Sequence, residues 1–195
     1  MSDKLSLDPK TSALLVMDFQ TSIVEMIAAT GDALLTRTAK LADAARAAGM
    51  RAIYVVVGFR AGYPEVSPRN QSFGPIRESG RFAEGAAGTE VYPALAPKPG
   101  EVVVRKHRVS AFAGTDLDMV LRANGIETLV LAGIATSGVV LSTVRHAADA
   151  DYRLVVVEDC CADRDAEVHR VLTEKVFPRQ ATIVKAEDVI AALTA

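Results

Sequence analysis

The amino-acid sequence predicts a three-layer α/β/α sandwich around a mainly parallel sheet of about six strands. Five runs, LLVM, IYVVV, EVVV, TLVLA and LVVV, are largely apolar on consecutive residues and do not alternate with polar ones. Such runs are typical of parallel strands that helices cover on both faces. At 195 residues, half of them hydrophobic, the chain is long enough to bury a sizeable core. We therefore expect residues 1–195 to form one domain.

Strands and helices alternate along the chain, so we expect right-handed crossovers between neighbouring parallel strands. The strands are predicted at Ala13–Met17, Arg51–Val57, Glu101–Arg105, Glu127–Ala132, Arg153–Val157 and Ala181–Val184. The helices are predicted at Ala33–Ala48, from about Asp116 to Ala123, from about Ser137 to Ala150, from about Asp165 to Val176, and at the C-terminus.

Local signals support several of these boundaries. Gly49 stops the first helix, and Asn124-Gly125 stops the second. Thr115 and Asp118 occupy the positions of a capping box at the start of that second helix.

The segment Gly58–Lys98 interrupts the alternation and is rich in Gly, Pro and Arg. A loop of this length inside a compact domain is usually functional or part of an oligomer contact. Because it follows the carboxyl end of the second strand, the edge where such sheets bind ligands, we expect both roles. The apolar composition also suggests surfaces that need cover, so a homo-oligomer, dimer or tetramer, is expected.

The charge balance excludes some classes of partner. Lys and Arg number 22 against 24 Asp and Glu, a net charge of -2, which gives no case for nucleic acid or an anionic membrane. The two cysteines, Cys160 and Cys161, are adjacent, unlike a disulfide framework or a zinc site. No apolar run reaches the roughly 18 residues of a membrane span, and the N-terminus lacks the apolar core of a signal peptide. A cytoplasmic protein is expected.

Three features lie at carboxyl ends of predicted strands and suggest one cleft. Asp18 follows the first strand, Lys106 ends the third, and the turn Gly133–Val140 (GIATSGVV) follows the fourth. The free N–H groups of such a turn favour negative charge, although Ser137 could equally be an ordinary N-cap. Alternation puts Lys106 on the side of Val104, away from Arg105, but does not say which side faces the cleft.

Four segments together resemble the isochorismatase-like hydrolase superfamily, which includes isochorismatases, nicotinamidases and N-carbamoyl amide hydrolases. They are LLVMDFQ at 14–20, the lysine closing VVVRK, the residues Val109–Phe112, and the turn Gly133–Val140. The resemblance covers nearly the whole chain, in order, and implies the α/β/α fold. It carries two members of an Asp–Lys–Cys triad onto Asp18 and Lys106, and it implies a cis peptide bond between Ile134 and Ala135.

The third member of that triad falls on Val139, whose side chain has no lone pair for attack on an amide. Ser137 lies two residues early and Ser142 one helical turn too deep, so neither is a convincing substitute. Cys160 and Cys161 are expected to be small packing residues. The amidase branch also binds metal through an Asp and two His after the second strand. Here Gly58–Gly62 stands in that place, and no metal or other cofactor is implied.

Isochorismatase chemistry needs no cysteine, because the resemblance implies that a carboxylic acid protonates the vinyl carbon of an enol ether. Asp18 is the expected acid if burial raises its pKa, with Lys106 orienting it and the amides of Ala135 and Val139 binding the substrate. The other expected substrate contacts are Gln20, Gln71, Phe73, Arg77, Arg81, Phe112, Thr136 and Ser137. Alternatives stay open: a non-catalytic protein that binds a small acid or serves as an oligomeric partner, and an amidase with another nucleophile.

Overall fold

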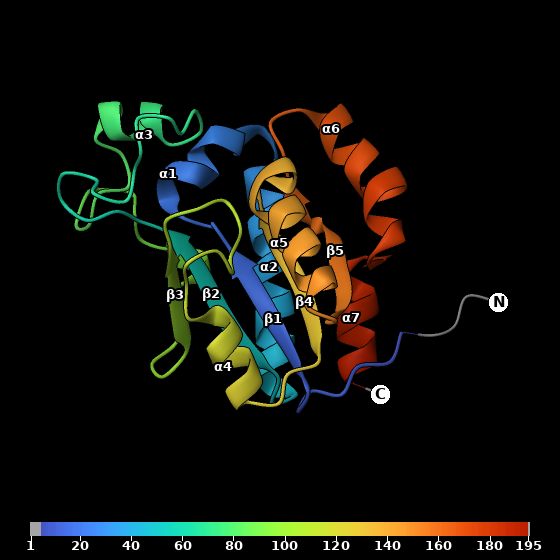
Figure 1. The fold of residues 1–195 in the computed structure, drawn as a ribbon. Coiled ribbons are helices and arrows are strands. Elements are labelled where there is room, and N and C mark those ends of the chain that lie inside the picture. The colour runs from blue at the N-terminus through green and yellow to red at the C-terminus, as the bar shows by residue number, and fades with distance from the viewer. Residues whose placement is uncertain (1–4, 195) are drawn as a thin grey trace.

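The protein folds as a six-stranded parallel sheet between two layers of helices (Figure 1), which confirms the predicted fold class. The computed structural model describes residues 5–194, except for the side chains of residues 28–31. The spatial order of the strands is β3-β2-β1-β4-β5-β6. Their bounds are β1 Ser12–Met17, β2 Arg51–Val57, β3 Val102–Lys106, β4 Thr128–Ile134, β5 Arg153–Ala162 and β6 Thr182–Val184.

Helices of unequal length connect the strands. The α-helices are α1 Thr21–Val24, α2 Ala28–Ala47, α3 Gly74–Ser79, α4 Leu117–Ala123, α5 Leu141–Asp149, α6 Ala166–Val171 and α7 Ala186–Leu193. Short 3-10 helices are η1 Glu25–Ile27, η2 Pro93–Leu95 and η5 Phe177–Arg179. Short π-helices are η3 Thr136–Val140 and η4 Leu172–Val176. The second predicted helix ends at Asn124-Gly125 as expected, and Gly125 adopts a positive φ of 63°.

The strands are buried on both faces, which explains their unbroken apolar runs. In β1, Leu14 and Val16 pack in a cluster with α1, α2 and α7. The alternate residues of β1, Leu15 and Met17, pack in a second cluster with α4 and α5. Successive side chains of a strand point to opposite faces, so each apolar residue of β1 contributes to one of the two cores.

Several predicted boundaries are wrong, and polar residues explain most of the errors. Strand β5 continues to Ala162, because Glu158 and Asp159, which interrupt its apolar run, pair with Lys185 and Arg37 at its edge. Residues expected to form one helix from about 137 to 150 form the π-helical turn η3 and then α5. The capping box at 115–118 is absent, since the Asp118 carboxylate accepts from Arg122 and Tyr152 instead.

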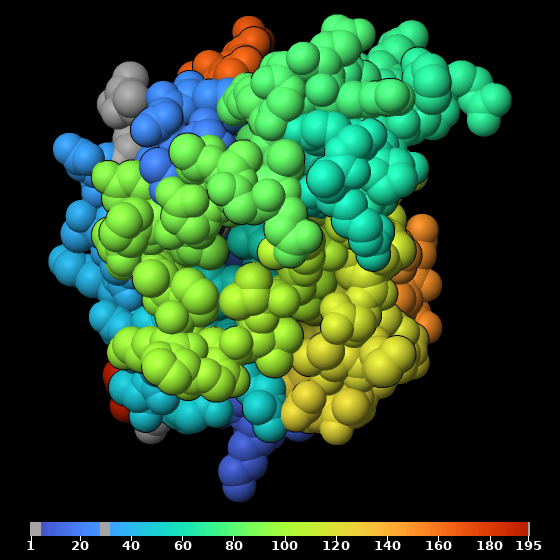
Figure 2. Space-filling view, turned by 90° about the vertical axis from the view of Figure 1, so that its left-hand side faces the viewer, coloured from blue at the N-terminus to red at the C-terminus, as the bar shows by residue number. Residues whose placement is uncertain are grey.

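The segment 58–98 lies beyond the carboxyl ends of β2 and β3, with α3 at its outer side (Figure 1). Seen from that side, it covers much of the upper part of the face that Figure 2 shows. Across the described part of the chain, 5–194, no helix combines the length and apolar character that a membrane crossing requires.

Candidate active site

Asp18 and Lys106 meet at the carboxyl ends of β1 and β3, on either side of β2. The Lys106 Nζ lies 2.9 Å from Oδ2 of Asp18, which confirms that the two side chains form an ion pair. Both are nearly inaccessible, Asp18 at 6% and Lys106 at 3% exposure. Lys106 therefore shares the buried side of β3 with Val104, which settles the direction that alternation left open.

The backbone leaves the strand conformation at Asp18, directly after the end of β1. Its φ is 58°, in the left-handed region that Asp tolerates better than most residues. Its N–H donates to the Val55 carbonyl at 2.8 Å, so the residue stays tied to β2 while its side chain turns toward Lys106.

Burial gives Asp18 an unusual electrostatic position. Its Oδ1 is buried and has no hydrogen-bond partner, whereas Oδ2 accepts from Lys106. Desolvation raises the pKa of Asp18, and the opposing charge and hydrogen bond of Lys106 do not cancel that effect. The ammonium of Lys106 also donates to the Arg108 carbonyl at 3.2 Å. The neutral form of Asp18 is therefore favoured up to a higher pH than for an ordinary aspartic acid.

The turn after β4 lies beside this pair. The peptide bond between Ile134 and Ala135 is cis, as the resemblance implied. Gly133 allows the close packing there, because a Cβ at that position would stand 3.0 Å from the Val140 side chain and 3.2 Å from the Met17 carbonyl oxygen. Val139 is buried within the turn η3, just before α5.

Two polar contacts hold the turn in place. The Thr136 hydroxyl is 2.8 Å from Nδ1 of His169, and the Ser137 N–H donates to Oδ2 of Asp163 at 2.7 Å. Burial lowers the pKa of His169, which favours its neutral form. Ser137 is not a helix N-cap, because it lies inside η3, whose N-cap is Ala135, and the N-cap of α5 is Val140.

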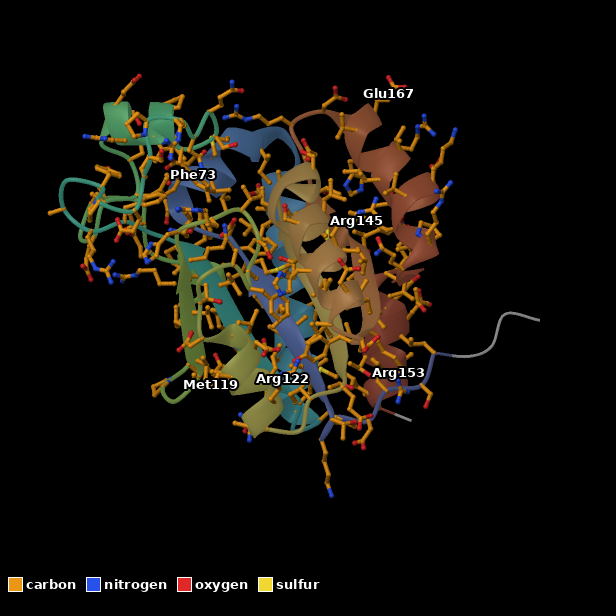
Figure 3. All side chains as sticks on the ribbon, in the orientation of Figure 1. Phe73, Met119, Arg122, Arg145, Arg153 and Glu167 are labelled. Carbon is orange, nitrogen blue, oxygen red and sulfur yellow. The ribbon has the colours of Figure 1, made fainter. Side chains whose placement is uncertain are left out.

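A cavity of about 450 Å³ opens over Asp18, Lys106 and the turn. Of the expected site residues, the lining includes Asp18, Lys106, Phe73, Arg81, Ala135, Ser137 and Val139. Its walls are otherwise mainly apolar, from Ile23, Met26, Ile27, Val57, Ile76, Phe82, Val109 and Ile134. Figure 3 shows Phe73 beside α1 at this end of the sheet.

Four expected substrate contacts do not line the cavity. Gln20 is fully buried, and its amide is bonded to the backbone of Val57 and Thr89. Gln71 and Arg77 are exposed on the outer segment around α3. Phe112 stacks on His146 within the other core, where the ring centroids are 4.6 Å apart.

Thr136, a fifth expected contact, supports the turn and does not line the cavity. Conversely, sequence reasoning missed Met26 and Arg164, which both line it. Arg164 is the second residue after β5, so a search near the strand ends would have found it if the true end of that strand had been recognised.

The two cysteines are packing residues, as expected. Cys160 and Cys161 lie within β5 and contribute to opposite cores, and neither lines the Asp18 cavity. Burial raises the pKa of the Cys160 thiol to about 12, and it raises the pKa of Cys161 as well. Neither is a ready thiolate near neutral pH.

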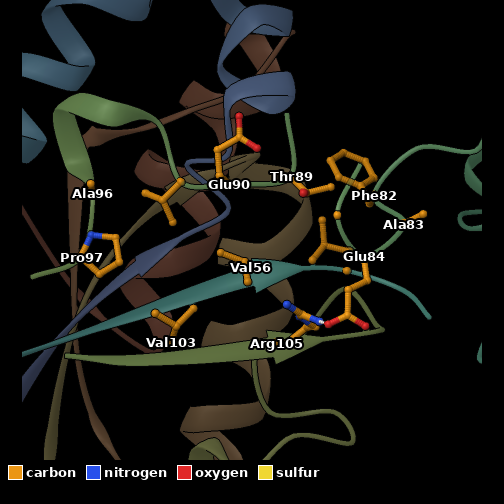
Figure 4. A pocket seen from close by; sticks show the side chains of 14 residues that line it. Val56, Phe82, Ala83, Glu84, Thr89, Glu90, Ala96, Pro97, Val103 and Arg105 are labelled. Carbon is orange, nitrogen blue, oxygen red and sulfur yellow. Dashed lines mark hydrogen bonds and ion pairs between the residues drawn. The ribbon is translucent and has the colours of Figure 1, made fainter. Parts of the chain in front are cut away.

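Other regions of the molecule offer less chemistry. Within the residues described, no group of three or more His, Cys, Asp or Glu side chains is placed to hold a metal ion. A second cavity of about 430 Å³ lies along β2 and β3 (Figure 4). The Arg105–Glu84 ion pair spans its edge at 2.6 Å, and neither Asp18 nor Lys106 lines it.

A parallel α/β/α sheet with a buried acid–lysine pair, a glycine turn and a cavity at its carboxyl edge has the arrangement of an α/β enzyme that binds a small molecule at the strand ends. Residues 12–188 match the isochorismatase domain, and the chain belongs to the isochorismatase family of hydrolases. It is 33% identical to the isochorismatase family protein YecD of Escherichia coli O157:H7, over 97% of this chain and 100% of that protein.

Other relatives and structures extend this picture. The chain is 32% identical to the ureidoacrylate amidohydrolase RutB of Methylorubrum extorquens, over 80% of this chain and 72% of that protein. The crystal structure of a cysteine hydrolase from Pseudomonas syringae pv. phaseolicola superposes with a TM-score of 0.90 at 25% identity. That superposition covers 100% of this chain and 99% of the other.

Proposed function

We propose that this protein hydrolyses an enol ether in a small carboxylate-bearing metabolite, with Asp18 as general acid and without a cysteine nucleophile. The observation that carries the proposal is the carboxyl group of Asp18. It is buried at the cavity, one of its oxygens lacks a partner, and its pKa is raised. A carboxylic acid that stays neutral can donate a proton near the pH at which the enzyme works.

In the proposed reaction, Asp18 transfers its proton to the terminal vinyl carbon, and the C=C electron pair forms the new C–H bond. Positive charge then develops on the ether carbon and oxygen as an oxocarbenium ion. Water adds to that carbon, its proton returns to the Asp18 carboxylate, and the hemiketal collapses to a ketone and an alcohol. The Lys106 ammonium, 2.9 Å from Asp18, stabilises the carboxylate that appears after the first step.

The turn supplies the remaining polar groups in this proposal. Ala135 and Val139 both line the cavity, and their backbone N–H groups would bind a substrate oxygen. Asp163 and His169 keep the turn in place through Ser137 and Thr136.

Val139 separates this proposal from amide hydrolysis. We take Val139 to occupy the position at which amide-cleaving relatives carry their cysteine, and its side chain shapes the cavity wall. Amide hydrolysis is the second candidate, favoured by the activity named for RutB. It would need a nucleophile such as the hydroxyl of Ser137, a residue that lines the cavity.

Pyruvate release from isochorismate and other enolpyruvyl ethers tests the reaction, with nicotinamide and ureidoacrylate as amide controls. The proposal predicts pyruvate release from at least one of these ethers, at a rate that Asp18→Asn lowers by roughly 10²–10⁴-fold, and no ammonia from the amides. Release of ammonia without any cleavage of enol ethers would favour the second candidate.

We also propose that residues 1–195 fold as one domain, that the protein is cytoplasmic, and that copies of the chain assemble into a homo-oligomer. Exposed apolar side chains on β3 and α4, Val102, Val103 and Met119, support a surface that a second copy covers. Light scattering at micromolar concentration should give a dimer or tetramer mass, and a monomer mass would contradict this part of the proposal.

A further inference from the structure

Two arginines from distant parts of the chain meet at the cavity. Arg81 follows α3, and Arg164 lies between β5 and α6. Both line the cavity above Asp18, and both donate through Nη2 to the same atom, the Sδ of Met26, within 3.5 Å. The Arg81 guanidinium also stands over the Phe82 ring, 5.1 Å from its centroid.

These guanidinium groups have more donors than the protein satisfies. Each carries five N–H donors, and a thioether sulfur is only a weak acceptor. Beyond Met26, Arg81 donates to the Ser22 carbonyl at 3.4 Å. Among the residues that the structure describes, neither arginine has a carboxylate partner, whereas Arg46 pairs with Glu101.

Two positive charges that share one neutral atom repel each other, and an anion between them would relieve that repulsion. A carboxylate suits the place, because its two oxygens can accept from two planar guanidinium forks at once. Both arginines are exposed, so a ligand can reach them without displacing buried structure.

The rest of the cavity does not favour a second negative charge. Phe73, Ile76 and Phe82 form apolar walls, and the cavity-lining Asp163 is an acid that already accepts from the Ser137 N–H. A second carboxylate among these walls would lose its hydration, and the remaining cation of the lining, Lys106, already donates to Asp18 and to the Arg108 carbonyl. The cavity therefore fits an apolar group better than a second acid.

We propose that Arg81 and Arg164 together bind the one carboxylate of a monoanionic enol ether whose alcohol part is apolar and packs on Phe73 and Phe82. This inference deepens the proposed function, since it names the substrate class of the same cavity. It also separates this protein from a hydrolase of isochorismate, which carries two carboxylates.

Binding of an unreactive analogue tests the inference apart from catalysis. The probe is 2-phenoxypropanoate, the saturated analogue of the enolpyruvyl ether of phenol, measured by isothermal titration calorimetry. We expect it to bind at least tenfold more tightly than neutral 2-phenoxypropanamide, and more tightly than the dianion 3-(1-carboxyethoxy)benzoate. Arg81→Gln and Arg164→Gln should each weaken its binding roughly tenfold or more, as expected for a lost charged hydrogen bond.

Arg77→Gln is the matched control, because Arg77 is an exposed arginine near Arg81 that does not line the cavity. It should leave binding of the probe unchanged. The inference is overturned if the acid and the amide bind equally, if both arginine variants bind like the wild type, or if no binding of the acid is detected. Binding that depends on both arginines, with no hydrolysis of 2-phenoxyacrylate to pyruvate and phenol, would sink the proposed reaction and leave the carboxylate site standing.

Discussion

The two ends of β3 each carry a largely buried ion pair, and the two pairs have opposite electrostatic outcomes. Glu101, just before the strand, lies 2.8 Å from Arg46, and Lys106, at its end, lies 2.9 Å from Asp18. The pKa of Glu101 is lowered by its hydrogen bond from Arg46, whereas the pKa of Asp18 is raised by burial.

Depth of burial and the number of donors explain the difference in pKa, since the distances are nearly equal. Both oxygens of Glu101 accept from Arg46, and Oε2 also accepts from the Lys98 N–H. Asp18 is more deeply buried, and its Oδ1 accepts no hydrogen bond. A short distance between opposite charges therefore does not by itself show that the carboxylate is stabilised in its charged form. The contacts of Glu101 favour its ionised form and stabilise the fold, whereas burial of Asp18 favours its neutral form.

The largest expected effect is on catalysis at the Asp18 end. Asp18→Asn should lower enol ether turnover by roughly 10²–10⁴-fold, because an amide cannot replace a positioned proton donor. Glu101→Gln should leave turnover per folded molecule nearly unchanged. Steady-state rates of pyruvate release would measure both, and equal losses in the two variants would remove the distinction between the pairs.

A thiol placed beside Asp18 should differ sharply from the native thiols. Val139→Cys should react with iodoacetamide at least about 100-fold faster than Cys160 or Cys161, whose burial raises their pKa. Mass spectrometry of the labelled native protein would locate the modified residue. Val139→Ala should change turnover only a few-fold. If alkylation of Cys160 or Cys161 abolishes wild-type turnover, the cysteine-free reaction is wrong.

Stability should respond mainly at the Glu101 end. Glu101→Gln should lower the free energy of unfolding by about 1.5–3 kcal/mol, because it removes charged hydrogen bonds from Arg46. Glu84→Gln is the control, since its pair with Arg105 is exposed and should contribute under about 1 kcal/mol. Urea unfolding measures both, and equal changes would show that burial of the Glu101 pair adds nothing.

The pH dependence of stability should have opposite signs at the two ends. Asp18, with its pKa raised from 3.8, contributes stability at low pH that is lost as the pH rises through its folded value. Glu101, with its pKa lowered from 4.5, contributes stability above that value that is lost as the pH falls. The wild type should thus lose stability relative to Asp18→Asn with rising pH, and gain it relative to Glu101→Gln. Unfolding curves of all three from about pH 3 to about pH 8 would reveal parallel slopes if this is wrong.

The sheet was predictable because strands buried on both faces need unbroken apolar runs, as β1 and β4 show. The ends of the strands also placed Asp18, Lys106 and the turn at one edge. Side-chain direction was not predictable in irregular segments, where no period applies. Arg81 and Arg77 come from the same segment, yet only Arg81 lines the cavity. Arg164 was missed because the polar residues Glu158 and Asp159 interrupt the apolar run of β5, so the strand was predicted to end at Val157.

The direct test of the central claim is the titration of the Asp18 carboxyl group. Carbon-13 NMR of the side-chain carboxyls, with Asp18 and Glu101 assigned by Asp18→Asn and Glu101→Gln, follows both ends of β3 in one sample. The pKa of Asp18 should lie above its ordinary value of 3.8, and that of Glu101 below 4.5. An Asp18 carboxyl that titrates at or below its ordinary value would contradict its role as the neutral acid.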